Sequence, residues 1–194
     1  MHRIQLYITL LLLVRTVSIN AQSSINIDSN IVLNDSYISI SLGYQMSGIK
    51  KVDFVYDNLS PSLSMSTGIW ISREIGVSLS YKGHYFYTIA DNARHNYSYF
   101  FLQTLINVSE YFRELHVLRS EFDLIPHFGY GIFYNAHYEG FQVNGNIGFI
   151  LSHELGKSSQ IYIDLSSVVG WDIYQGNEDI LPSAAIGLII DVNK

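Results

Sequence analysis

The sequence predicts an all-β fold, an eight-stranded antiparallel up-and-down transmembrane β-barrel. Apolar and polar residues alternate with a period of two through nearly every segment after residue 34, which is the repeat of a strand. The polar positions hold mostly Ser, Gly, Asn and Gln, with few charges. Aromatic residues stand at the ends of the apolar rows, namely Tyr85, Tyr87, Tyr134, Tyr138 and Trp171. A barrel that turns its apolar side to lipid, with aromatic girdles at both interfaces, has this pattern.

Composition narrows the class of protein further. Of the 194 residues, 48% are hydrophobic and 14% are charged, where about 25% charged is usual. The net charge is −6 and no basic tract occurs, so we expect no nucleic-acid partner. The chain has no cysteine, which excludes disulfides, thiolate metal sites, a Cys nucleophile and a lipidated N-terminal Cys.

The first segment, residues 1–21, is predicted to be a signal peptide. A short basic start is followed by an apolar run over residues 4–14 and by a more polar stretch with a small residue, Ala21, at the expected cleavage point. The alternative is an N-terminal membrane anchor, but the run has about half of the roughly 20 apolar residues that a spanning helix needs. Residues 22–34 are then an N-terminal segment, and residues 35–194 form the barrel domain.

The first four strands are predicted at residues 36–46, 62–72, 75–88 and 97–109. All reach the roughly 9–11 residues that cross a bilayer when tilted. Their apolar rows, in order, are Ile38, Ile40, Leu42, Tyr44 and Met46; Leu63, Met65, Ile69 and Ile71; Ile75, Val77, Leu79, Tyr81, Tyr85 and Tyr87; and Phe100, Leu102, Ile106 and Val108.

The last four strands are predicted at residues 124–138, 141–154, 160–174 and 183–192. Their apolar rows are Leu124, Phe128, Tyr130, Ile132 and Tyr134; Phe141, Val143, Ile147, Phe149 and Leu151; Ile161, Ile163, Leu165, Val169, Trp171 and Ile173; and Ala184, Ile186, Leu188, Ile190 and Val192. Long and short links alternate in part, which predicts longer outer loops, shorter periplasmic turns and both termini inside. The long link at 110–123 departs from this, and we expect an amphipathic cap on the inner mouth.

Alternation also occurs in soluble β-barrels, so the polar face decides between the two. A soluble sheet shows water a row of Lys, Glu, Thr and Arg, whereas these rows suit a narrow enclosed lumen. The soluble alternative, an exported barrel that binds a small apolar ligand, predicts an apolar interior instead. In the transmembrane barrel we expect Lys82, His84, Gln103, Glu154, Asp164 and Asp172 to point inward as a polar plug. With Tyr99, Phe101, Phe133 and Tyr162 also inside, the barrel should conduct little.

Glycine–aromatic alternations carry a resemblance to known proteins. The segments are PHFGYGIFY at 126–134, NIGF at 146–149 and AIGLII at 185–190. With them, the chain resembles the small outer-membrane β-barrel proteins of Bacteroidetes, similar in architecture to the OmpA/OmpX-type barrel domain. The resemblance implies the bacterial outer membrane as the location, after signal-peptide cleavage. It also implies outer-membrane lipid, lipopolysaccharide and the barrel assembly machinery as partners, with a surface ligand bound through the outer loops.

No catalytic, cofactor-binding or metal-binding residue is predicted. The seven histidines show no His-x-x-His or His-Glu-x-x-His spacing, so a metal centre is not indicated. Some barrels of this kind are lipid A-modifying enzymes, and the candidate pairs for such an activity are His95 with Ser98 and His137 with Glu139. Neither pair lies in a recognisable motif. The leading hypothesis is therefore a non-enzymatic barrel with a structural or surface-interaction role.

Overall fold

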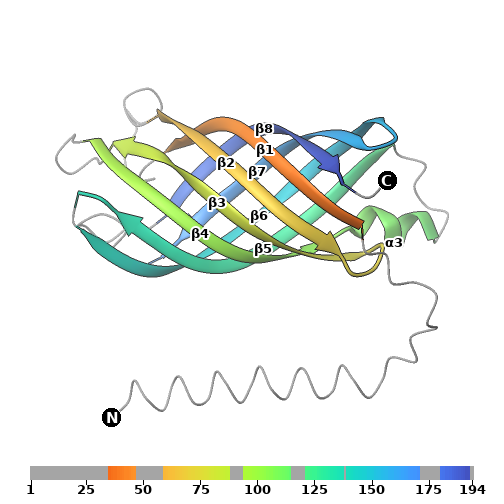
Figure 1. Ribbon diagram of the computed structural model, residues 1–194, viewed down its shortest axis with the longest axis horizontal. Coiled ribbons are helices and arrows are strands. Elements are labelled where there is room, and N and C mark those ends of the chain that lie inside the picture. The colour runs from red at the N-terminus through yellow and green to blue at the C-terminus, as the bar shows by residue number, and fades with distance from the viewer. Residues whose placement is uncertain are drawn as a thin grey trace, which may run out of the picture. The chain divides into compact units, whose positions relative to one another are not determined.

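The computed structural model describes residues 35–46, 59–87, 94–114, 121–137, 139–170 and 180–192. These residues form eight strands and one short helix (Figure 1). The strands are β1 (Asp35–Met46), β2 (Leu59–Trp70), β3 (Ile75–Tyr87), β4 (Arg94–Ile106), β5 (Phe122–Asn135), β6 (Gly140–Gly156), β7 (Ser159–Val169) and β8 (Ile180–Asp191), and the helix is α3 (Val108–Glu114).

Every strand pairs antiparallel with the next one along the chain, and β1 closes the sheet by pairing with β8. The closing ladder runs from Tyr37 opposite Asp191 to Gln45 opposite Ser183. The predicted closed, eight-stranded, up-and-down barrel is therefore confirmed. We call the end where β1 begins and β8 ends the proximal end, and the opposite end the distal end.

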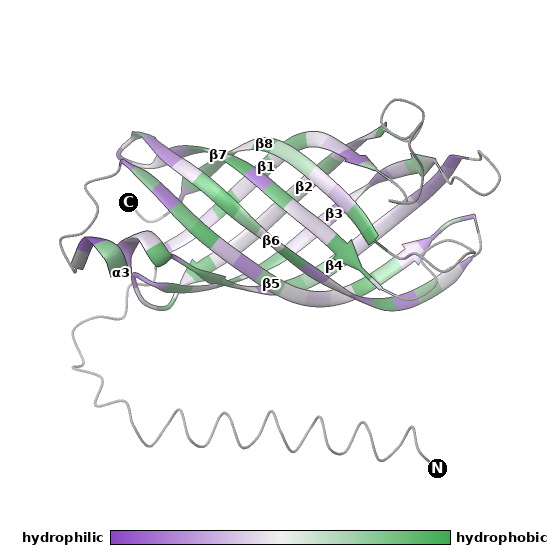
Figure 2. Cartoon of the chain, turned by 180° about the vertical axis from the view of Figure 1, so that it is seen from behind, coloured by the Kyte–Doolittle hydropathy of each residue, from purple (hydrophilic) through white to green (hydrophobic). Residues whose placement is uncertain are grey.

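The two faces of the barrel wall differ in chemistry as predicted. Large apolar side chains are exposed on the outside, for example Leu42 (63%), Val143 (76%) and Ile186 (55%). Small polar side chains such as Ser41 and Asn144 are buried inside. Hydropathy consequently alternates along each strand (Figure 2). The soluble alternative required the reverse arrangement, so the structure contradicts it.

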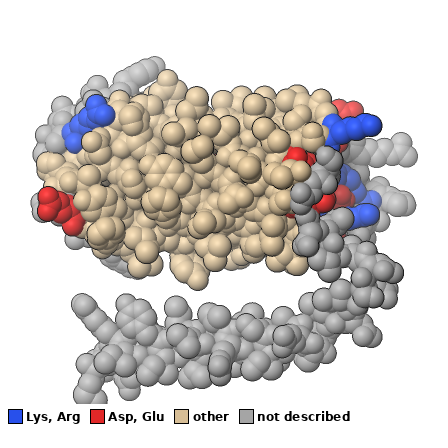
Figure 3. All heavy atoms as spheres, in the orientation of Figure 1, with Lys and Arg blue, Asp and Glu red and all other residues tan. Residues whose placement is uncertain are grey.

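Charged side chains avoid the middle of the outer surface. On the face drawn in Figure 3, acidic and basic residues lie at the two ends of the barrel and none lies across its middle. Lys82 and Asp164 are the charged residues of the described strands that lie away from the strand ends, and both line an internal cavity. The middle of the outside is therefore largely apolar and carries no charged side chain of the described strands.

Most strand boundaries differ from the prediction by one to five residues, and two strand ends illustrate the difference. The seventh strand ends at Val169 rather than at residue 174, and the fourth ends at Ile106 rather than at 109. At the second boundary, the Asn107 side-chain oxygen accepts hydrogen bonds from the backbone N–H groups of Ser109 (3.1 Å) and Glu110 (3.3 Å). This N-cap favours a helix over a strand from that point.

The helix α3 covers an edge that β4 leaves open. The β4–β5 ladder ends at Leu105 opposite His127, and the next residue of β5, Pro126, has no backbone N–H. Below it, the Leu124 N–H donates to the Ser109 hydroxyl of α3 (2.8 Å), and Arg113 forms an ion pair with Asp123. Where an amphipathic cap was expected, the described part of this link forms the short helix α3, which binds the free edge of β5.

The signal peptide, the segment 22–34 and most residues of the predicted outer loops lie outside the described residues, as do the Tyr87 side chain, Tyr138 and Trp171. Within the residues that the structure describes, no helix is long and apolar enough to cross a membrane.

Candidate functional site

The lumen is the part of the molecule where chemistry-bearing side chains gather, and an apolar cluster closes its distal half. We call this cluster the distal seal; its members are Phe86, Tyr97, Tyr99, Phe101, Phe133, Val168 and Leu181. The rings of Tyr97 and Phe133 are stacked at 5.0 Å, and those of Tyr99 and Phe101 at 4.6 Å. Tyr99, Phe101 and Phe133 are therefore inside, as predicted.

A second apolar cluster closes the proximal half. This proximal seal consists of Tyr37, Leu105, Ile125, Tyr162 and Ile189. Two glycines make room for its rings. A Cβ atom at Gly68 would lie 2.7 Å from the Tyr37 ring, and one at Gly187 would lie 2.6 Å from the Tyr162 ring. Both positions face the lumen, so the absence of a side chain there lets a tyrosine ring lie against the wall.

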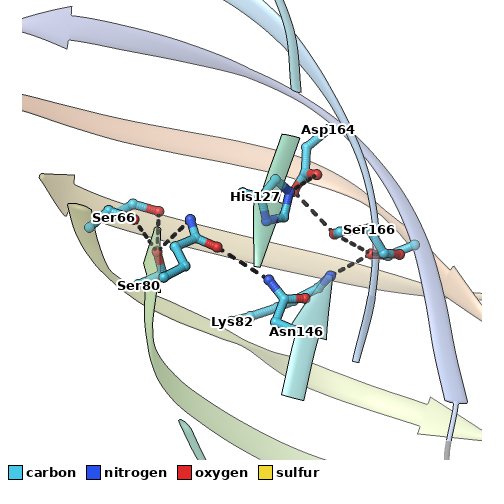
Figure 4. Close-up of polar contacts among 10 residues, drawn as sticks. Ser66, Ser80, Lys82, His127, Asn146, Asp164 and Ser166 are labelled. Carbon is cyan, nitrogen blue, oxygen red and sulfur yellow. Dashed lines mark hydrogen bonds and ion pairs between the residues drawn. The ribbon is translucent and has the colours of Figure 1, made fainter. Parts of the chain in front are cut away.

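A polar layer lies between the seals, and one half of it contains the lumenal charges (Figure 4). The Lys82 ammonium donates to the Ser183 hydroxyl from the other side of the barrel, and that hydroxyl lies 3.1 Å from the Ser166 hydroxyl. Ser166 in turn donates to Asp164 (3.2 Å), and the same carboxylate lies 3.1 Å from Nε2 of His127. A chain of polar contacts thus connects an ammonium to a carboxylate and an imidazole.

The other half of the layer is uncharged. The Asn146 amide donates to the Gln103 side-chain oxygen (3.3 Å), and the Gln103 amide donates to the Ser80 hydroxyl (3.4 Å). Ser80 then donates to Ser66 at 2.9 Å. Such a network fixes the side chains of β2, β3, β4 and β6 relative to one another, because each amide or hydroxyl has a preferred partner.

The predicted plug residues are placed as expected only in part. Lys82 and Gln103 are buried, and Asp164 lines the internal cavity. His84 is exposed instead, because its φ of 133° interrupts the alternation of β3, and its ring packs on Tyr85 at 4.6 Å. Glu154 is exposed at the proximal mouth, beside the bulge that ends β6. Asp172 lies outside the described residues.

The candidate catalytic pairs gain no support from the geometry. His95 is buried in the lumen, whereas Ser98 lies on the opposite face of β4, with its hydroxyl 3.5 Å from that of Tyr81. His137 and Glu139 are both exposed in the turn between β5 and β6, and the His137 ring lies 4.1 Å from that of His95. Among the residues that the structure describes, no group of three His, Asp or Glu side chains is placed to hold a metal ion.

The sequence did not predict the side-chain contacts that cross the lumen. Lys82 and Ser183 are 101 positions apart on strands that are not neighbours in the sheet. Alternation predicts that each faces inward, but their meeting depends on the tilt and stagger of the whole barrel. The contact between His127 and Asp164, on strands β5 and β7, depends on the same geometry.

Comparison with known proteins shows the fold. No protein-family model matches the sequence, and no curated protein sequence matches it. The crystal structure of Neisserial surface protein A has a TM-score of 0.55 at 8% identity, covering 80% of this chain and 96% of that one. OprG of Pseudomonas aeruginosa has a TM-score of 0.50 at 9% identity, covering 84% and 98%. A major outer membrane protein from Thermus thermophilus also has a TM-score of 0.50, at 11% identity, covering 80% and 99%. The chain has the fold of these outer-membrane barrels.

Proposed function

We propose that this chain is a bacterial outer-membrane β-barrel protein without an open channel, and that it has a non-enzymatic structural or surface-interaction role. The observation that carries the proposal is the inverted distribution of polarity. Large apolar side chains cover the middle of the outer face, charged side chains lie at the two ends on the face drawn in Figure 3, and small polar groups are buried in the lumen. A closed barrel satisfies every backbone hydrogen bond without an edge, which a hydrocarbon environment requires.

The filled lumen favours a structural or binding role over transport. The distal seal and the proximal seal close the barrel on both sides of the polar layer. Eight strands leave an interior just wide enough for side chains to fill. Functional contacts with other molecules would then be made by the outer surface and the loops.

The expected partners follow from this location. The apolar middle of the outer face suits membrane lipid, and the distal end would face the cell exterior, next to lipopolysaccharide, with a surface ligand bound by its loops. The export signal at residues 1–21 and delivery by the barrel assembly machinery complete the proposal. The Bacteroidetes origin rests on the sequence resemblance alone.

Cell fractionation tests the location. The mature protein should be found in the outer-membrane fraction, require detergent for extraction, and migrate differently on a gel before and after heating. Recovery as a soluble periplasmic protein would overturn the proposal.

Labelling of single thiols tests the orientation of the wall, and the cysteine-free chain is suited to it. Leu165 is 40% exposed on the outside and its neighbour Ser166 is 8% exposed on the inside. In intact membranes, the thiol of Leu165→Cys should react with a lipid-soluble reagent and resist a charged one. The matched variant Ser166→Cys should resist both reagents. Ready labelling of Leu165→Cys by the charged reagent would contradict the lipid-facing assignment.

A further inference from the structure

A pocket opens at the proximal mouth of the barrel, beside α3 (Figure 1), and we propose that it binds a free basic amino acid, a ligand with one carboxylate and two positive groups. Its volume is about 150 Å³. Pockets for drug-sized ligands measure roughly 300–1,000 Å³, so this one suits a smaller molecule. The inference concerns binding at this mouth and does not depend on the cellular location of the barrel.

One side of the pocket offers hydrogen-bond acceptors. Asp35, at the start of β1, and Glu154, near the end of β6, line it, and their carboxylates form no ion pair with the described residues. Gln160 lies opposite Glu154 in the β6–β7 ladder and adds an amide oxygen. Carboxylates accept strong, charge-assisted hydrogen bonds from ammonium groups. This side therefore suits the positive groups of the ligand.

Another side offers donors. It is formed by the turn between β2 and β3 and by the end of β4, which are held together where the Asn107 backbone N–H donates to the Glu74 carbonyl (2.7 Å). Arg73 of this turn lines the pocket, and its guanidinium forms no ion pair with a carboxylate of the described residues. A guanidinium is well suited to bind a carboxylate, because its N–H groups match the two oxygens.

The Asn107 side chain is a second donor on this side. The residue is 7% exposed, and its side-chain oxygen accepts from the backbone N–H groups of Ser109 and Glu110. The amide N–H groups are then the ones left to face the pocket, and they donate to no described residue. A polar group that is largely buried and lacks a partner is costly, so an acceptor on a ligand would be stabilised here.

Charge and apolar surface select the side chain of the ligand. Arg113 is already paired with Glu110 and Asp123. In all, four carboxylates and two guanidinium groups line the pocket, so its net charge is −2 and it favours a ligand of positive net charge. Trp70 and Ile125 add apolar surface, against which the methylene groups of a lysine-like side chain can pack.

Isothermal titration calorimetry of the full chain, folded in detergent micelles, tests the proposal with L-lysine as the probe. Two analogues separate the parts of the ligand. L-lysinamide lacks the carboxylate, and L-norleucine lacks the side-chain ammonium. Each analogue should bind at least about tenfold more weakly than L-lysine, because each loses hydrogen bonds that involve a charged group.

Asn107→Asp separates the donor from the helix cap. Aspartate keeps the oxygen that caps α3 and is an equally good N-cap, but it replaces the amide donor with an acceptor. Binding of L-lysine should weaken about tenfold, whereas L-lysinamide should bind at least as tightly as it does to the wild type. Arg73→Gln should also weaken the binding of L-lysine and not that of L-lysinamide. The matched control Lys157→Gln removes a positive charge from the β6–β7 turn, outside the pocket, and should change neither.

Each outcome decides the proposal. A wild-type protein that does not bind L-lysine would overturn it. Equally tight binding of L-lysinamide would also overturn it, since the mouth would then only attract cations. Unchanged binding of L-lysine by Asn107→Asp, with folding confirmed by the heat-dependent gel shift, would contradict the assigned contact. If that variant does not fold, Arg73→Gln in the turn and the two analogues still decide. The titration is made in detergent, so its failure would leave the outer-membrane location standing.

Discussion

Adjacent residues of this wall lie in opposite surroundings, and the difference is largest near the middle of a strand. Leu165 is on the outside, whereas Asp164 and Ser166 on either side of it face the polar layer. A shift of the strand by one residue would turn Leu165 into the lumen and Asp164 and Ser166 to the outside. The loss of folding free energy caused by a charge at Leu165 therefore shows which face of the strand is turned to lipid.

Leu165→Arg should destabilise the barrel by roughly 2–4 kcal/mol, because it exposes a charge to the hydrocarbon interior. Leu155→Arg is the matched control. Leu155 is also outward and exposed (59%), but it lies next to the proximal turn, where the same change should cost about 0–1 kcal/mol. Equilibrium unfolding in urea with lipid vesicles measures both. Equal costs at the two sites would argue against a membrane around the middle of the strand.

His84 is a second position where one residue departs from its neighbours. Its φ of 133° is a region that favours glycine, and a non-glycine residue there is strained. His84→Gly should therefore raise the free energy of unfolding by about 1 kcal/mol, the released strain exceeding the entropy that glycine loses on folding. His84→Ala keeps the strained backbone and loses the ring contact with Tyr85, so it should give no gain. A gain in the alanine variant as large as in the glycine variant would show that the side chain, and not the backbone, is responsible.

At the scale of elements, the strands and the direction of most side chains could be predicted from the sequence. Side chains of a strand point alternately to the two faces of the wall, and here one face is apolar and the other is polar. The alternation within each strand therefore indicates which residues face outward and which face the lumen. The end of β4 at Ile106 was missed because Asn107 caps a helix with its side chain. The prediction that His84 points inward was wrong because a single positive φ breaks the repeat.

The proximal seal depends on close packing between strands β1, β7 and β8 around Gly187. Gly187→Ala should destabilise the barrel by about 1–3 kcal/mol, because the new methyl group would collide with the Tyr162 ring and with the backbone of β1. The control is Gly145→Ala, where the nearest atom is a carbonyl oxygen at 3.6 Å, an ordinary contact. That change should be nearly neutral. If both variants unfold at the same urea concentration, the close packing of Tyr162 against β8 is wrong.

For the whole molecule, the decisive property is that two seals close one lumen in series. Each consists of aromatic and aliphatic side chains contributed by several strands, and a polar layer fixed by hydrogen bonds lies between them. The sequence indicated that Tyr99, Phe101, Phe133 and Tyr162 are inside. It could not indicate how they divide between two clusters, because that division depends on where the strands are staggered.

Planar-bilayer recording tests this arrangement. The purified wild-type monomer should show no large, stable current. Tyr162→Ala truncates the proximal seal and Phe133→Ala truncates the distal one, and each variant should also remain closed because the other seal is intact. A large current from the wild type, or from either single variant, would show that the seals do not act in series.

The pairing of β1 with β8 has a consequence for how the protein folds. Seven of the ladders join strands that are consecutive in the chain, but this one joins Tyr37 to Asp191. Since closure entropy grows with the logarithm of loop length, forming this ladder first would cost about 2–3 kcal/mol more than forming a hairpin. The seam should therefore be the last ladder to form, and its closure should set the folding rate. Because the start of β1 and the end of β8 are neighbours, a short linker could join them and the chain could be opened at a distal loop instead. In such a circular permutant the slow seam would move to the new opening, while the finished barrel would stay the same.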